Sequence, residues 1–266
     1  MKIALYVRSD NVHQSFFEEL LRRRALSYEL NPRDTTRCTH AISLGGDGTF
    51  LSAVRTMGAS QRLPLMGVNT GRLGFLATVS LAQVDQALDS IERSTYRTEQ
   101  RAMIDVSNIA NCINARATAL NEFSIQKSGT SMIHIHMTVD GVLAASYWAD
   151  GVIVSTPTGS TAYSMSVSGP ILTPECRCFV VSPIAPHNLS IRPLVVGDGA
   201  MLGITVTSRT NADSISTLDN KEYKAASGSS YMITKSADCQ EVISLQDNNF
   251  YDTIREKLLW GVDLRN

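Results

Sequence analysis

Residues 41–57, AISLGGDGTFLSAVRTM, decide the fold of this chain. The stretch begins as a short apolar run, passes through three glycines around Asp47, and continues with apolar residues at helical spacing. Those apolar residues are Phe50, Leu51, Val54 and Met57. Gly58 follows as a helix stop signal. A buried strand that turns through glycines into a helix is the repeating unit of an open parallel sheet, so this stretch predicts an α/β domain.

The same alternation of strand and helix extends to both sides of this stretch. Residues 2–7 and 63–68 have the composition of short buried strands. Ser80 and Gln83 have the spacing of a capping box at the start of a helix. The apolar faces of the two further helices are expected at Val12, Phe16, Phe17, Leu20 and Leu21, and at Leu81, Val84, Leu88 and Ile91. We therefore expect residues 1–98 to form a Rossmann-like parallel sheet with helices on both faces.

Short β patterns replace the helical periodicity after about residue 98. In the clearest of them, apolar residues alternate with polar ones at Ile133, Ile135, Met137 and Val139. Asp140-Gly141 follows as a hairpin turn, and Gly197-Asp198-Gly199 is expected to be another. Residues 99–240 are therefore expected to form an all-β, β-sandwich-like domain. Helical spacing returns at Phe250, Ile254, Leu258 and Leu259, and we expect residues 241–266 to pack back on the α/β domain.

Composition argues against several classes of partner. The formal net charge of -1 gives no electrostatic footprint for nucleic acid. No apolar run approaches the ~18 residues of a membrane span, and the strand-like residues 1–7 do not read as a signal peptide. The five cysteines are scattered, at Cys38, Cys112, Cys176, Cys178 and Cys239. Such a pattern is typical of free thiols in a reducing cytoplasm, where we expect this protein.

The glycines around Asp47 suit the binding of a phosphate. They let the backbone approach a ligand closely, and the helix N-terminus that follows offers free N–H groups. The turn is not a P-loop, because it lacks the lysine, and it is not G-x-G-x-x-G, because it lacks the third glycine. Asp47 could accept a proton from an attacking hydroxyl, hold a magnesium ion, or serve as an ordinary helix N-cap. The local pattern leaves these alternatives open.

The string Gly45-Gly46-Asp47-Gly48-Thr49 resembles the signature shared by NAD kinases, 6-phosphofructokinases, and the diacylglycerol and sphingosine kinases. The resemblance implies phosphoryl transfer, with Gly45, Gly46, Gly48 and Thr49 against the donor phosphates. It does not choose the acceptor. A lipid or sugar kinase stays open at this point, as does a non-catalytic NAD sensor, although a sensor is expected to have lost Asp47 or the glycines.

Four further segments resemble NAD kinases in particular. They are GVNTGRLGFL at 67–76, Asn121-Glu122, DGVIVSTPTGSTAYS at 150–164 and SPIAPHNLSIRPLV at 182–195. The third is close to diagnostic for that family. An amide beside a carboxylate can hold ribose hydroxyls, since one donates and the other accepts. The NAD-binding residues that the resemblance implies are Asp47, Gly48, Phe75, Asn121, Glu122, Asp150, Thr158, Thr161, Ala162, Tyr163, Ser166 and Ala185.

Two segments depart from the family pattern. The family usually carries S-A-G-G-P where this chain has SVSGP at 166–170, so the resemblance does not fix the shape of the pocket near Ser166. An Asp-Gly-Gln turn is usual where this chain has DNK at 219–221, and Asn tolerates the left-handed conformation that such a turn needs. His187 is interpreted as structural or pocket-lining rather than as a base, and His134 and His136 as strand residues that face solvent rather than as metal ligands.

The resemblance implies direct transfer from a triphosphate to NAD, giving NADP. Asp47 is expected to position the 2′-hydroxyl of the adenosine ribose and to accept its proton, while alignment and charge neutralisation supply the rate. The expected cofactor is Mg²⁺, and the donor is ATP or polyphosphate. The resemblance also implies a homo-oligomer, a dimer or a tetramer built through the β domains. Donor preference and the choice between NAD and NADH stay open.

Overall fold

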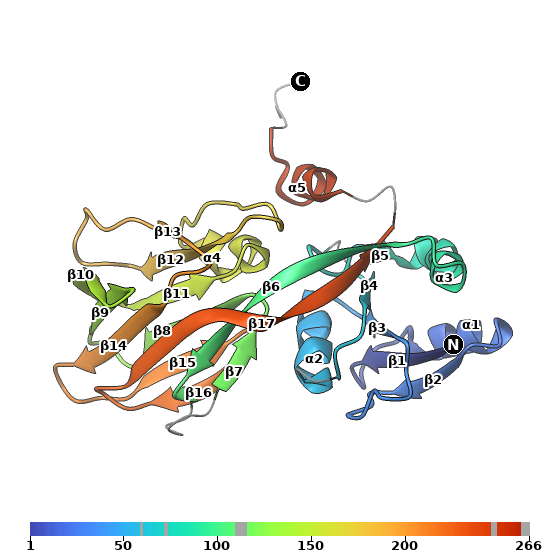
Figure 1. Cartoon of the computed structure of the whole chain (residues 1–266), viewed down its shortest axis with the longest axis horizontal. Helices are drawn as coiled ribbons and strands as arrows, with labels where there is room; N and C mark the ends of the chain where they lie inside the picture. Colours follow the sequence, from blue (N-terminus) through green and yellow to red (C-terminus); the bar gives the residue numbers. More distant parts are fainter. Residues whose placement is uncertain (59–60, 72–73, 110–115, 246–248, 262–266) are drawn as a thin grey trace. The chain divides into compact units, whose positions relative to one another are not determined.

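The computed structural model describes residues 1–58, 61–71, 74–109, 116–245 and 249–261. It divides the chain into two compact units, residues 1–100 with 240–266, and residues 101–239 (Figure 1). Strands β6 (Arg97–Ser107) and β17 (Ser230–Ser244) each contribute to both units. Arg72 and Leu73 of the glycine-rich string, and Cys112, lie outside the described residues.

The first unit is built on a parallel sheet, as the sequence predicted. Its strands lie in the order β5-β4-β3-β1-β2, and the end of β17 also pairs with β4, Val242 opposite Leu65. The strands are β1 (Lys2–Val7), β2 (Ser27–Leu30), β3 (His40–Leu44), β4 (Leu65–Asn69) and β5 (Val79–Ser80). The helices are α1 (Gln14–Arg23), α2 (Asp47–Met57), α3 (Val84–Glu92) and α5 (Phe250–Leu258).

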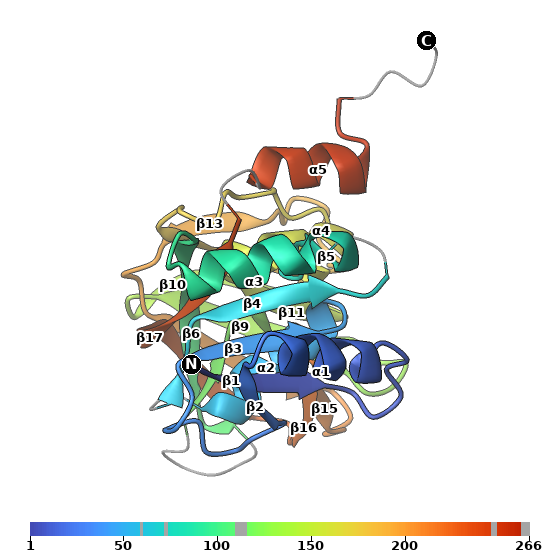
Figure 2. The same ribbon diagram turned by 90° about the vertical axis from the view of Figure 1, so that its right-hand side faces the viewer.

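Helices lie on both faces of this sheet (Figure 1), and Figure 2 shows α1 and α3 in front of its strands. On one face, Phe17 and Leu21 of α1 share a core with Leu88 of α3. On the other, α2 buries Phe50 and Val54. The capping box at Ser80 and Gln83 forms, before a short 3-10 turn η2 (Leu81–Gln83). The predicted apolar face of the first helix is wrong in part, since Val12 and Phe16 are exposed and the buried face is narrower.

The second unit consists of two antiparallel sheets around one core, which confirms the predicted all-β class. One sheet has the order β13-β12-β11-β8-β15-β16, and the other contains β10-β9-β14-β17 with β6 and β7. The strands not yet bounded are β7 (Arg116–Ala119), β8 (Glu122–Lys127), β9 (Ile133–Val139), β10 (Val142–Ala149), β11 (Gly151–Ser155), β12 (Cys178–Ile184), β13 (Leu194–Gly197), β14 (Leu202–Ser208), β15 (Ser214–Leu218) and β16 (Lys221–Ala225). Two short helical turns follow β11, η4 (Thr158–Thr161) and α4 (Tyr163–Ser166).

The two predicted β turns have different outcomes. Asp140 and Gly141 both have positive φ and join the paired strands β9 and β10, so this hairpin is confirmed. The turn at residues 197–199 is not a hairpin, because β13 pairs with β12 whereas β14 pairs with β9 and β17 in the other sheet. This turn carries the chain from one sheet to the other. Among the described residues, no helix is long and apolar enough to cross a membrane.

Candidate functional site

The glycine turn that follows β3 has an open face. Gly45 has a φ of 154°, and a Cβ there would lie 2.3 Å from Thr49 Oγ1, so the tight turn requires glycine. A Cβ at Gly46 or Gly48 would meet no atom within 4 Å. Helix α2 begins at Asp47, immediately after the turn. Exposed glycine backbone beside the free N–H groups of a helix N-terminus suits an anionic group such as a phosphate.

The carboxylate of Asp47 is fixed by backbone donors from the segment 74–77. Its Oδ1 accepts the N–H groups of Leu76 and Ala77 at 3.0 and 2.9 Å, and its Oδ2 accepts that of Phe75 at 2.9 Å. A Cβ at Gly74 would lie 2.0 Å from Oδ1, so only glycine leaves room for the carboxylate. Asp47 is therefore not a helix N-cap, since the N-cap of α2 is Gly46 and the carboxylate accepts from the segment 74–77 instead. Oδ2, with one backbone donor, keeps a lone pair for a further partner.

Helix α5 contributes contacts to this group that sequence analysis missed. The Phe250 ring lies 6.3 Å from the Phe75 ring, centroid to centroid. Lys257 Nζ lies 4.5 Å from the centroid of the Phe75 ring and 3.6 Å from Asp47 Oδ2. No motif or spacing marks Lys257 in the sequence. We call residues 45–49 and 74–77, with Lys257, the Asp47 cluster.

In the second unit, Asn121 and Glu122 lie at the start of β8 with only 6% and 7% of their surfaces exposed. Asn121 Oδ1 and Glu122 Oε2 are buried without a hydrogen-bond partner among the described residues. Burial, and then the charge of Asp219, raise the pKa of Glu122 to about 8, although a hydrogen bond from the backbone of Tyr163 opposes the shift. Glu122 is thus largely protonated at neutral pH, so it can donate as well as accept.

Asp219 is a second residue that sequence analysis missed as part of the site. It lies in the β15–β16 turn with a φ of 50°. Its carboxylate accepts the backbone N–H groups of Leu120, Asn121 and Glu122 at 3.1, 2.7 and 3.3 Å. Asp219 therefore fixes the segment that carries the amide and the carboxyl. The DNK string at 219–221 predicted a turn. The sequence around it does not reveal that Asp219 binds the backbone of residues 120–122, about a hundred positions earlier.

The Ser- and Thr-rich loop after β11 packs on the same segment. Thr156 Oγ1 donates to the Leu120 carbonyl at 2.6 Å. A Cβ at Gly159 would lie 2.1 Å from the Asn121 carbonyl oxygen, so this contact requires glycine. Thr158 and Thr161 are buried. The structure thus brings five of the predicted NAD-binding residues together. We call these residues the Glu122 cluster: Asn121, Glu122, Thr158, Thr161 and Tyr163.

The remaining predicted residues of this unit are at or near its surface. Ala162 is half-buried, and Ser166 and Ala185 are exposed. Asp150 forms an ion pair with Lys127 at 2.6 Å, and its N–H donates to the Ile184 carbonyl, which places it beside Ala185.

Tyr163 connects this group to the Glu122 cluster. The β8–β11 register pairs Glu122 with Ser155 and Gln126 with Gly151, so the two ends of β8 lie about 14 Å apart. The backbone of Tyr163 bonds Glu122, while its hydroxyl donates to Gln126 Oε1 at 3.1 Å. Its side chain thus runs along this interval.

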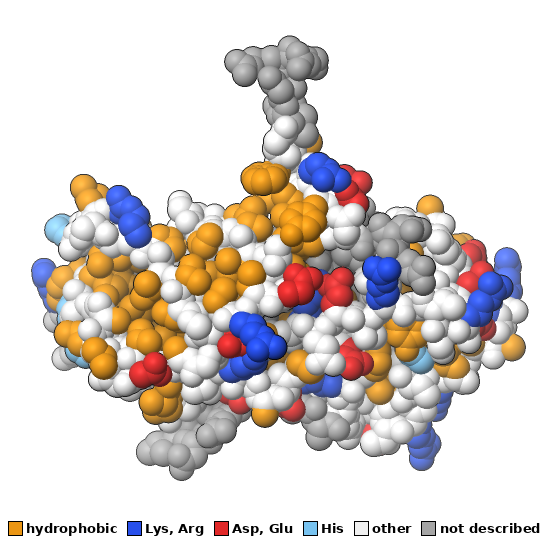
Figure 3. Space-filling view, turned by 45° about the horizontal axis from the view of Figure 1, so that its top comes forward, with side chains coloured by type: hydrophobic (Ala, Val, Ile, Leu, Met, Phe, Trp, Pro, Cys, Tyr) orange, Lys and Arg blue, Asp and Glu red, His pale blue; other side chains and the backbone are white. Residues whose placement is uncertain are grey.

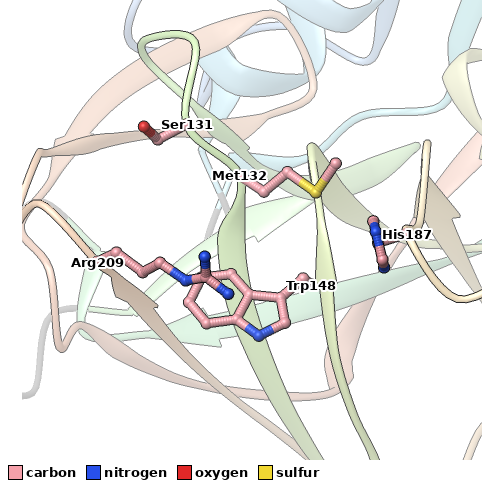
Figure 4. A pocket seen from close by; sticks show the side chains of 5 residues that line it. All are labelled: Ser131, Met132, Trp148, His187 and Arg209. Atoms are coloured by element: carbon pink, nitrogen blue, oxygen red, sulfur yellow. The ribbon is translucent and has the colours of Figure 1, made fainter.

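His187 lines a cavity of about 350 Å³ with Ser131, Met132, Trp148 and Arg209 (Figure 4). The guanidinium carbon of Arg209 lies 4.4 Å from the centroid of the Trp148 ring. The backbone N–H of His187 donates to the Trp148 carbonyl at 2.8 Å. The ring of His134 lies against the same Trp148, tilted by 50° with ring centroids 4.9 Å apart, and His136 is exposed. No group of three metal-ligating side chains occurs in the described part of the chain.

Comparisons with known proteins give one family. Residues 7–96 match the model of the ATP-NAD kinase N-terminal domain, and residues 120–245 that of the ATP-NAD kinase C-terminal domain. The chain is 37% identical over 237 residues to an NAD kinase of Cytophaga hutchinsonii, covering 89% of this chain and 80% of the relative. It is 42% identical over 228 residues to an NAD kinase of Flavobacterium psychrophilum, covering 85% and 77%.

Two solved structures are also similar. An NAD kinase from Archaeoglobus fulgidus in complex with ATP has 26% identity and a TM-score of 0.83, covering 96% of this chain and 99% of that one. Yeast NADH kinase complexed with NADH has a TM-score of 0.90 over 100% of this chain and 89% of that one. Its 19% identity supports the fold alone.

Proposed function

Because the chain belongs to the NAD kinase family, we propose that the Asp47 cluster and the Glu122 cluster, one in each unit, both take part in its reaction. The reaction of the family moves a phosphoryl group from ATP to NAD and yields NADP, and this chain catalyses it. We assign the phosphoryl donor to the Asp47 cluster and the adenosine ribose to the Glu122 cluster.

The observation that carries the ribose assignment is the pair of unsatisfied oxygens, Asn121 Oδ1 and Glu122 Oε2. A buried polar atom without a partner costs about 1–3 kcal/mol, so it marks a place where a ligand supplies the missing bond. Asn121 Oδ1 accepts from a ribose hydroxyl. The protonated Glu122 donates to the other ribose hydroxyl or accepts from it, and Asp219 holds the backbone N–H groups of both residues in place.

The role of Asp47 follows from its hydrogen bonds. With three backbone donors fixing the carboxylate, the free lone pair of Oδ2 points in one direction without reorganisation. We assign to this oxygen the 2′-hydroxyl of the ribose, which it orients and whose proton it accepts as the γ-phosphoryl group moves. Gly46 and Gly48 leave room for the phosphates of the donor.

Magnesium enters this proposal only with the donor. The described residues offer no ready cage for the ion. Mg²⁺ usually keeps several waters and binds through one or two carboxylates together with substrate phosphates. We therefore infer that the ion would arrive with the triphosphate and would neutralise phosphate charge there, and ATP is the donor we propose.

The exposed side chains of the second unit bear on the assembly of the protein. The second unit exposes Val142, Leu143, Val195 and Met232 between 47% and 70%, and Figure 3 shows hydrophobic side chains gathered over that unit. This surface suits a homo-oligomer built through the β domains.

Free thiols favour a reducing cytoplasm as the location, and the described cysteines are free: Cys38, Cys176, Cys178 and Cys239. The mass of the protein in solution measures its oligomeric state. For the domain boundaries we propose residues 1–98, 99–240 and 241–266.

The first experiment is NADP formation from NAD and Mg-ATP by the purified protein, read through an NADP-specific dehydrogenase. Omission of Mg²⁺ and replacement of ATP by polyphosphate test the cofactor and the donor. Asp47→Asn is expected to lower kcat about 10³-fold, in the range of general-base losses. Because asparagine also loses one acceptor for the backbone donors, its folding and NAD affinity are measured alongside. A folded Asp47→Asn protein that keeps a tenth or more of the turnover contradicts the base assignment.

A further inference from the structure

Phosphoryl transfer needs positive charge beside the group that moves. In P-loop enzymes a lysine within the loop reaches the β- and γ-phosphates. The turn at Gly45–Thr49 has no basic side chain, and it carries the negative charge of Asp47 instead. A triphosphate beside this turn would lie next to the Asp47 carboxylate, and the turn itself has no cation to balance the two negative groups. Some other part of the chain must therefore supply a cation, even if Mg²⁺ comes with the donor.

Lys257 on α5 supplies one at the right place. Its Nζ lies 3.6 Å from Asp47 Oδ2, the oxygen that keeps a free lone pair. That distance is too long for a hydrogen bond, and within the described part of the chain Lys257 makes no hydrogen bond. Its three N–H donors are therefore available to a ligand, although the side chain is only about one third exposed (34%).

The helix face that carries Lys257 is oriented toward the site by its own packing. Phe250 and Lys257 are two turns apart, and both contact Phe75. Ile254, between them on the same face, is buried. The backbone N–H of Phe75 in turn donates to Asp47 Oδ2. The Lys257 ammonium is thus held against the ring of Phe75, the residue whose backbone N–H donates to the Asp47 carboxylate.

A purely structural role accounts poorly for this placement. An exposed ion pair contributes about 0–1 kcal/mol and an exposed cation–π contact about 0.5–1 kcal/mol. A cation in the last turn of a helix also suits the helix dipole, but Arg255 lies in the same turn and is paired with Asp252 instead. The dipole therefore does not explain why Lys257 faces Asp47.

We propose that Lys257 is a catalytic residue that contacts the oxygens of the phosphoryl group in transit and so takes the part of the missing loop lysine. This inference rests on the proposed function. In the step, the bond from the 2′-oxygen to the γ-phosphorus forms and the bond from that phosphorus to the β–γ bridging oxygen breaks. The hydroxyl proton goes to Asp47, the leaving ADP keeps the electron pair, and Lys257 stays protonated throughout.

Four variants test the role. Lys257→Met keeps an apolar stem over Phe75 and removes the charge, and we expect kcat to fall about 100-fold, as when one transition-state donor is lost. The KM for NAD is expected to change less than about threefold, because the contact is to the donor. Lys257→Arg should keep at least a tenth of kcat. Lys257→Ala should regain activity, in a saturable manner, with added ethylammonium. Arg255→Met, the matched control in the same helical turn, should have wild-type kcat.

Each outcome has a definite meaning. A folded Lys257→Met protein with kcat within threefold of wild type refutes the inference, as does an equal loss in Arg255→Met. Loss of activity in Lys257→Met and Lys257→Arg alike, with no rescue of Lys257→Ala by ethylammonium, also refutes it, because a structural role predicts that result. Wild-type protein is assayed in parallel. If wild type forms no NADP from NAD and Mg-ATP, the proposed function fails, and that result is separate from a failure confined to Lys257.

Discussion

Glu122→Gln is the most informative change in the ribose site. The pKa of Glu122 rises from 4.5 to about 8 on folding, chiefly because of burial and then because of Asp219. Because Glu122 binds its proton more tightly in the folded chain, this proton adds to the free energy of unfolding. The contribution is complete below pH 4.5 and is lost as the pH rises through about 8. At about 1.4 kcal/mol per unit, the ceiling of that loss is on the order of 5 kcal/mol.

The glutamine variant stays neutral at every pH and resembles the protonated acid in shape. Wild type should therefore lose stability relative to Glu122→Gln between pH 5 and 9. Relaxation of the site and entry of water reduce the ceiling, so we expect a relative loss of at least about 2 kcal/mol, or about 4–8 °C in Tm. Differential scanning calorimetry at several pH values measures this. Glu222→Gln, on the exposed strand β16, is the matched control and should follow wild type.

Parallel Tm curves for wild type and Glu122→Gln from pH 5 to 9 would refute the reasoning, because Glu122 would then titrate alike in the folded and the unfolded chain. The same pair of proteins reports on the ligand. If the protonated acid is the form that binds ribose, the affinity of wild type for NAD should fall as the pH passes about 8. That of Glu122→Gln should stay nearly constant over the same range.

Two further predictions concern the backbone donors that fix the two carboxylates. Gly74→Ala places a Cβ 2.0 Å from Asp47 Oδ1 and must displace the carboxylate. We expect kcat to fall at least about 100-fold, since misplaced catalytic groups lose that much, with NAD affinity within threefold, measured by steady-state kinetics and calorimetry. Unchanged kcat would contradict the positioning role of this segment. Asp219→Asn leaves the buried Leu120 N–H without its acceptor, at a cost of about 1–3 kcal/mol. It should weaken NAD binding about tenfold with little change in kcat at saturating NAD. A selective loss of kcat would be the contrary result.

Local pattern predicted the parts of the fold that local pattern controls. The strand, turn and helix at residues 41–57 form as expected, because apolar runs, glycines and helical spacing all lie within one short segment. The hairpin at Asp140-Gly141 follows from two residues that tolerate positive φ. The prediction of a hairpin at residues 197–199 was wrong because local pattern does not determine strand pairing. The glycines there indicate a change of direction but not which sheet the next strand joins.

The site was predictable in its residue types and not in its contacts. The Asp47 and Glu122 strings stood out through resemblance, and their roles stay predictions until the variants are measured. The partners that fix them lie far along the chain, Asp219 beside Glu122 and Lys257 beside Asp47. Such pairs have no periodicity, because the fold rather than local spacing brings them together. Burial of Glu122, which sets its pKa, is likewise a property of the packed unit.

The discontinuity of the first unit affects the order in which the protein can be completed. Residues 101–239 are synthesised between its two parts, which takes on the order of ten seconds at cellular rates of translation. During that time the edge of β4 near Leu65 has no neighbour, because Val242 has not yet been added. An unpaired strand edge is a template for association with other chains. The growing chain therefore exposes this strand edge from the time β4 forms until β17 pairs with it.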